Sequence, residues 1–72
     1  MAKHMSYEAF LDEVTTLITE KYAAEDQAAI NMVMRAQEDS YFTSHDDDPT
    51  LRTLDRAHKD ASILFRKYGP RP

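Results

Sequence analysis

The 72-residue chain contains no cysteine and only one glycine, and each of these scarcities excludes a class of function. Without cysteine there is no disulfide framework, no thiolate nucleophile and no cysteine-based zinc site, and the composition fits a reducing compartment. One glycine cannot form a phosphate-binding loop or a dinucleotide-binding fingerprint. No apolar run approaches the roughly 18 residues that cross a bilayer, and the first ten residues lack the apolar stretch of a signal peptide. We therefore expect a cytoplasmic protein that needs no cofactor and does not contact membranes.

Length and composition predict one small folded domain. Hydrophobic residues make up 42% of the chain and charged residues 31%, which is ordinary for a soluble globular protein. A chain of this size buries only about 60% of the surface that its unfolded form exposes, so a deep catalytic cleft beside a core is not expected. We expect a single domain over residues 1–72, no enzymatic activity, and flexible ends at about 1–5 and 70–72. Because the core is small, a homodimer stays open beside a monomer.

The spacing of apolar residues predicts helices. A β protein would need turn residues roughly every 8–12 positions, and this chain has only one glycine and three prolines. Apolar residues recur instead at i, i+3, i+4 and i+7 in three segments. The sequence thus predicts an all-α three-helix bundle with helices at about 7–22, 26–41 and 49–68.

Capping residues mark several of these helix ends. Ser6 is a favourable N-cap for the first helix. Asp48 and Pro49 favour a helix start, because aspartate caps well and proline fits the first helical position. Gly69 followed by proline ends the third helix.

The boundary between the first two helices is inferred from their phase. Ile30 lies 23 residues after Tyr7, two positions out of step with a seven-residue repeat, so one straight helix would turn the second apolar stripe away from the first. We expect a break near residues 23–26, with Glu25 or Asp26 opening the second helix; a single bent helix is the alternative. Met32 is assigned to the core or to a subunit interface. The predicted core consists of Phe10, Leu11, Val14, Leu17, Ile18, Ile30, Val33, Met34, Leu54, Ala61, Leu64 and Phe65.

Charge is divided unevenly along the chain. Residues 1–48 carry eleven acidic and three basic side chains, whereas residues 49–72 carry two acidic and six basic ones. The balance therefore changes from −8 to +4, and such an asymmetry bears on partner choice rather than on the fold.

The basic residues of the third predicted helix gather on one face. At 3.6 residues per turn they fall with Ile63 in one arc of about 100°. An apolar residue inside a basic rim is typical of an interaction surface for a larger protein with an acidic patch. A solvated face that balances the acidic helices is the alternative. The predicted partner-binding residues are Arg52, Arg56, Lys59, Ile63, Arg66 and Lys67.

The stretch TSHDDDPT at residues 43–50 is the densest polar run, with potential metal ligands at four consecutive positions from His45 to Asp48. A calcium loop needs acidic residues at alternate positions, a central glycine and a final glutamate. Zinc and di-iron sites need histidines and carboxylates on facing helices. The run has neither pattern, so we expect a capping loop with a solvated acidic tip and no bound metal.

His58 is the other candidate for chemistry, because Asp55 precedes it by three residues. A general base would also need a pocket and an orienting partner, and Asp55 could supply only a local hydrogen bond. A di-metal site would need a second Asp-x-x-His pair, which the sequence lacks. We expect His58 to be a partly buried residue at the border of the core.

These observations favour a small non-enzymatic protein-binding module, a regulator or inhibitor that docks on a larger host protein. Compact, cysteine-free, charged proteins of this size include many phage or mobile-element products, an association of class only. Nucleic-acid binding through the basic face of the third helix is the alternative. A metal-dependent activity at residues 45–48 is the second alternative.

Overall fold

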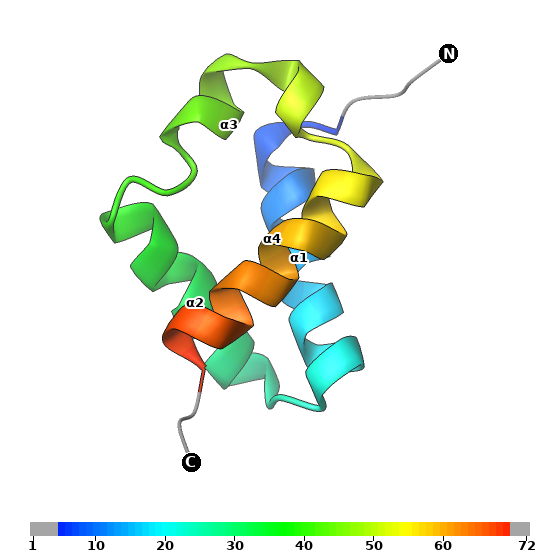
Figure 1. Cartoon of the computed structure of the whole chain (residues 1–72), viewed down its shortest axis with the longest axis vertical. Coiled ribbons are helices and arrows are strands. Elements are labelled where there is room, and N and C mark those ends of the chain that lie inside the picture. The colour runs from blue at the N-terminus through cyan, green and yellow to red at the C-terminus, as the bar shows by residue number, and fades with distance from the viewer. Residues whose placement is uncertain (1–4, 70–72) are drawn as a thin grey trace.

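The computed structural model describes residues 5–69, and these residues form three long helices with a short helical connection between the second and the third (Figure 1). No strand occurs within this range. The predicted all-α class and the bundle of three long helices are confirmed. The elements in chain order are α1 (Tyr7–Tyr22), α2 (Asp26–Glu38), α3 (Thr43–Asp47), the 3₁₀ turn η1 (Pro49–Leu51) and α4 (Leu54–Tyr68).

α1 and α2 are separate helices, as their phase predicts. Ser6 caps α1 by accepting a hydrogen bond from the amide of Ala9. α1 stops because Ala23 turns into the left-handed region at φ 54°, and α2 then opens at Asp26 after the extended Glu25. A left-handed alanine is unusual, since its Cβ is crowded in that conformation.

The third long helix begins later than predicted. Asp48 and Pro49 do start a helical segment, but only one 3₁₀ turn: the Asp48 carboxylate accepts from the amide of Thr50. α4 begins at Leu54 under a second cap, in which the Thr53 hydroxyl accepts from the amide of Arg56. Two capping signals five residues apart thus divide the predicted helix into a turn and a long helix.

Gly69 ends α4, as predicted, but not through a left-handed conformation. Its φ is −74° and its amide donates to the carbonyl of Phe65. A Cβ at position 69 would press against that same carbonyl oxygen. Glycine is needed there because the backbone folds closely over the last turn.

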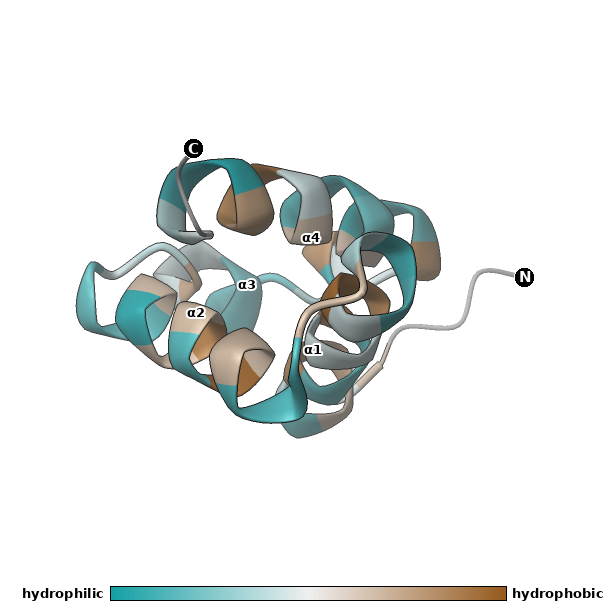
Figure 2. Cartoon of the chain, turned by 90° about the horizontal axis from the view of Figure 1, so that it is seen from below, coloured by the Kyte–Doolittle hydropathy of each residue, from teal (hydrophilic) through white to brown (hydrophobic). Residues whose placement is uncertain are grey.

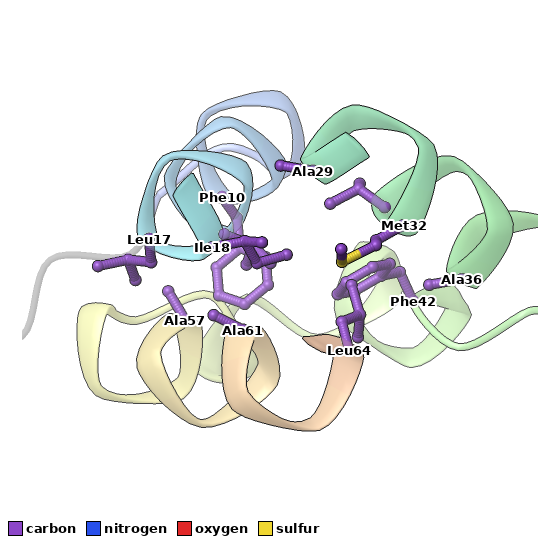
Figure 3. Close-up of a cluster of buried hydrophobic side chains, with 12 residues drawn as sticks. Phe10, Leu17, Ile18, Ala29, Met32, Ala36, Phe42, Ala57, Ala61 and Leu64 are labelled. Atoms are coloured by element: carbon purple, nitrogen blue, oxygen red, sulfur yellow. The ribbon is translucent and has the colours of Figure 1, made fainter. Parts of the chain in front are cut away.

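The core lies between the three long helices. α4 packs against both α1 and α2, which pack against each other, and Figure 2 shows α4 on one side of the bundle with α1 and α2 on the other. Twelve hydrophobic side chains are buried in one cluster, and Figure 3 shows Met32 of α2 reaching toward Phe42 and Leu64. The cluster comprises Phe10, Val14, Leu17, Ile18, Ala29, Met32, Val33, Ala36, Phe42, Ala57, Ala61 and Leu64.

The predicted core face of α2 is wrong in part. Ile30 and Met34 are 40% and 52% exposed, whereas the buried side of α2 carries Ala29, Met32 and Ala36 besides Val33. The second helix is predicted to reach residue 41, but α2 ends at Glu38, so Tyr41 lies beyond it. Met32 is a core residue, which agrees with the first of its two predicted placements.

Other core predictions also change at the ends of elements. Leu54 is 53% exposed because it opens α4, where no helix covers it, while Phe42 is fully buried between α2 and α3. Leu11 and Phe65 are only partly buried against the cluster.

The predicted flexible ends lie mainly outside the described residues, namely at 1–4 and 70–72. Met5 is described, and it contacts the rest of the chain. Its amide donates to the carbonyl of Arg52 over 2.9 Å, and its side chain packs against the core. Of the helices in residues 5–69, none has the length and apolar character required to cross a membrane.

Candidate functional site

Four of the six predicted partner-binding residues remain available on the outer side of α4. Lys59, Arg66 and Lys67 are exposed, and Ile63 is partly buried. These four residues are called the α4 basic face below. Ile63 is less exposed than predicted, because it follows the buried Asp60 by three residues and lies at the border of the packed side.

Arg52 does not belong to this face. It lies before α4, and its guanidinium binds three backbone carbonyls: Nε donates to Met5 over 2.7 Å, and Nη1 donates to His45 over 2.6 Å and to Asp46 over 3.0 Å. Hydrogen bonds from charged donors to backbone carbonyls contribute to stability. In this structure Arg52 ties the chain before α1 to the end of α3.

Arg56 is also engaged within the molecule. Its Nε lies 3.4 Å from Oδ1 of Asp60, one turn further along α4, and its side chain is 35% exposed. The Asp60 carboxylate is fully buried, so Arg56 offsets a negative charge that the core encloses. Arg56 is therefore less available to an external partner than the residues of the α4 basic face.

The stretch at residues 43–50 has the predicted exposed acidic tip and the predicted cap at Asp48, but it is helical rather than a loop, and His45 is not solvated. Residues Thr43–Asp47 form α3, and His45 is turned inward with only 3% exposure. Asp46, Asp47 and Asp48 are exposed. His45 and the three aspartates thus point to different environments. Within residues 5–69, no group of three or more histidine or acidic side chains is placed to hold a metal ion.

His45 joins a buried polar cluster that links three segments. Its Nε2 lies 2.8 Å from Oδ2 of Asp60 in α4, and the hydroxyl of Tyr41 donates to Oδ1 of the same carboxylate over 2.8 Å. A hydrogen bond from His45 to an ionised carboxylate requires a proton on Nε2. Burial, together with the hydrogen bond to Asp60, raises the pKa of Tyr41 far above its ordinary value.

Aromatic rings enclose His45. The centroid of its ring lies 5.4 Å from that of Phe10, 5.1 Å from that of Phe42 and 5.9 Å from that of Tyr41. Its Nδ1 is buried and has no hydrogen-bond partner among the described residues. A ring nitrogen without a proton costs less free energy when it is buried without a partner than an N–H donor does. This difference favours a proton on Nε2 rather than on Nδ1.

The buried cluster is suited to structure rather than to catalysis. A histidine beside an aspartate can act as a general base only where substrate reaches it. Here the side chains of His45 and Asp60 are 4% and 0% exposed. The cluster instead attaches α3 to α4 and orients both.

The sequence contains a signal for this cluster that the sequence analysis did not use. Asp60 completes an i, i+3, i+4, i+7 set with Ala57, Ala61 and Leu64, all of which are buried. A carboxylate inside an apolar stripe predicts a buried acid that needs donors from elsewhere in the chain. The identity of those donors, Tyr41 and His45, is not evident from spacing.

His58 is exposed, contrary to the predicted partial burial. The packed side of α4 is centred on Ala57, Ala61 and Leu64, and His58 lies roughly 100° of helix rotation beyond Ala57. It therefore faces solvent and does not belong to the buried cluster.

Neither a family model, nor a curated protein, nor a solved structure matches this chain. A function must therefore be inferred from the residues of the chain itself.

Proposed function

We propose that this chain is a small non-enzymatic protein-binding module that docks on a larger protein through the α4 basic face. One observation carries the proposal: Lys59, Arg66 and Lys67 are exposed around the partly exposed Ile63, on a helix whose other side is buried in the core. An apolar contact within a charged rim is the usual anatomy of a protein interface. Because α4 is packed on two other helices, the face is held rigid before binding, which lowers the entropic cost of docking.

The partner expected for this face is a larger protein with an acidic patch. Opposite charges steer two proteins together and fix their orientation. The charge of residues 1–48 supports docking through α4 rather than through α1 or α2. These residues carry a balance of −8 and would be repelled by the partner's acidic patch. The charge asymmetry would therefore turn α4 toward the partner and α1 and α2 away from it.

A regulatory or inhibitory role suits a module that covers part of a partner's surface. The inaccessibility of the His45–Asp60 pair supports a non-enzymatic role. The absence of cysteine fits a cytoplasmic setting. A phage or mobile-element origin rests on an association of class only.

The experiment is an affinity capture from the cells that make the protein, in which the wild type is compared with Lys59→Glu/Arg66→Glu. Both side chains are exposed, so the variant should keep the fold and lose the captured protein. Variants of Arg56 or Ile63 are less suitable, since one pairs with the buried Asp60 and the other is partly buried. The control is Lys21→Glu, which replaces an exposed lysine of α1 and changes the charge of its site by the same amount as each α4 substitution.

Binding to nucleic acid through α4 is tested in a separate assay with the same variant. Contacts with phosphates make affinity fall steeply as salt rises. A labelled DNA duplex and a labelled single strand should show no binding at low salt. Tight, salt-sensitive binding of either, weakened in Lys59→Glu/Arg66→Glu, would overturn the protein-binding proposal.

A further inference from the structure

A groove runs along the side of the bundle where α1 and α2 meet. It is an open hollow of about 620 Å³. Its α1 wall is formed by residues between Glu8 and Thr16, and its α2 wall by residues between Ile30 and Gln37. Figure 2 shows that α4 lies across the opposite side of these two helices. The groove is therefore separate from the α4 basic face.

An apolar strip runs through this groove, formed mainly by residues of α2, although Gln37 adds a polar group to the α2 wall. Val33 is buried at 4% exposure, whereas Ile30 and Met34 are 40% and 52% exposed. Leu11 of α1 is partly buried opposite them. Ile30 and Met34 are four residues apart, so they are neighbours on the helix surface and form one apolar strip rather than scattered exposed residues.

The α1 rim of the groove is acidic. Glu8 and Asp12 lie one turn apart and are both exposed. None of the residues that line the groove is basic. An occupant that covers the apolar strip would therefore gain most if it carried positive charge along the edge facing α1.

The shape of the groove favours a helical segment. The wall from Glu8 to Thr16 covers eight residue steps, or roughly 12 Å of helix. That length accommodates two to three turns of a partner helix, whose apolar residues at i, i+3, i+4 and i+7 would meet the strip. A small molecule would stay largely exposed in an open hollow, whereas good ligand sites bury most of their ligand.

A second copy of the chain is a less suitable occupant, although its α4 is basic. The groove and α4 lie on opposite sides of the bundle, so one copy's α4 in another copy's groove would be a head-to-tail contact. Contacts of that kind continue into rings or filaments rather than closing a dimer.

We propose that the groove between α1 and α2 binds a cationic amphipathic helix of another protein, with Ile30, Met34 and Leu11 as the apolar contact and Glu8 and Asp12 as the charged one. The groove is thus a second docking surface, independent of the α4 basic face and of opposite charge. A module with both surfaces can hold two proteins together.

The test uses a fluorescent peptide of about 14 residues, with leucine along one helical face and lysine along the other. Fluorescence anisotropy measures its affinity for the wild type, for Ile30→Ser/Met34→Ser and for Leu54→Ser. Leu54 is 53% exposed on α4, so it is a matched control for the loss of an exposed apolar side chain. The double variant should bind at least about ten-fold more weakly, and the control should bind within about two-fold of the wild type. Equal affinities for the wild type and the double variant would overturn the proposal.

Two further readouts keep the result specific. Glu8→Gln/Asp12→Asn should weaken binding at low salt and have little effect at high salt, because exposed charges are screened. NMR shifts of the methyl groups of Ile30 and Met34 should move on titration. Shifts confined to α4, or self-association that Ile30→Ser/Met34→Ser abolishes, would contradict a separate partner helix. Lys59→Glu/Arg66→Glu should leave the peptide affinity unchanged, which distinguishes failure of this proposal from failure of the α4 proposal.

Discussion

The Nε2 atom of His45 lies 2.8 Å from Oδ2 of Asp60, and neither side chain is accessible to solvent. This contact joins the five-residue α3 to α4, fifteen residues further along the chain. α3 is too short to be stable by itself. Its position therefore depends on the buried carboxylate, on the enclosing aromatic rings and on the carbonyl contacts of Arg52.

Replacement of Asp60 by alanine should destabilise the fold strongly. It would leave the hydroxyl of Tyr41 and the Nε2 of His45 without a partner inside the core. Leaving a buried donor without its partner costs about 1–3 kcal/mol for each group. Urea unfolding followed by circular dichroism measures the loss, with the exposed Asp55→Ala on the same helix as the control, expected within about 0.5 kcal/mol of the wild type. Equal stability of the two variants would show that the cluster contributes nothing.

Stability should fall at alkaline pH, and Tyr41 should be a major cause. Its pKa is raised above the ordinary value near 10 by burial and by the hydrogen bond to Asp60. The folded state then keeps the proton where the unfolded state loses it, so the contribution is complete below about pH 10 and declines as the pH rises further. The slope should approach about 1.4 kcal/mol per pH unit for each such group.

Tyr41→Phe provides the check on this pH dependence. The variant should be less stable than the wild type at pH 8 and should lose less stability between about pH 10 and 11. Tyr68 retains a raised pKa through its hydrogen bond to Asp39, so part of the slope should remain. An unchanged slope in Tyr41→Phe would mean that this residue is not the cause.

Ala23→Gly should stabilise the protein. Ala23 ends α1 at φ 54°, where an alanine costs roughly 1–2 kcal/mol. Glycine avoids that cost but adds unfolded-state entropy worth about 0.4–1 kcal/mol. The expected net gain is up to about 1 kcal/mol, visible as a higher midpoint in urea. Ala28→Gly, inside α2, is the comparison and should destabilise by about 1 kcal/mol.

Arg52→Gln should reduce stability rather than partner binding. The guanidinium holds the carbonyls of Met5, His45 and Asp46, and hydrogen bonds from charged donors are worth about 1.5–3 kcal/mol before allowance for partial exposure. Hydrogen exchange of the Met5 amide, which donates to the carbonyl of Arg52, should become faster. If the variant kept its stability but bound the partner more weakly, Arg52 would be a partner-binding residue and not a structural one.

The sequence predicts α1 almost completely, because its large apolar residues and its cap agree. Phe10, Val14, Leu17 and Ile18 are both predicted and buried. In α2 two of the four buried residues are alanines, which allow close helix contact but give a weak apolar pattern. The larger Ile30 and Met34 therefore dominate the prediction although they line the groove.

The polar parts of the structure are the least predictable from spacing. His45 and Asp60 are far apart in sequence, and their pairing depends on how α3 returns over the core. Arg52 is at a position that suits a basic helix face, but the helix begins after it. Local patterns predict which residues cap a helix and which face of a helix is charged. Tertiary packing decides which of these polar side chains become partners in buried hydrogen bonds.

The affinity of the captured partner for purified wild-type protein and for Lys59→Glu/Arg66→Glu tests the central proposal most directly. Isothermal titration calorimetry should show binding to the wild type and to Lys21→Glu with similar affinity. The α4 variant should bind at least about ten-fold more weakly, while its helical circular dichroism and urea midpoint remain close to those of the wild type. If the folded α4 variant binds the partner as tightly as the wild type does, the α4 basic face is not the docking surface.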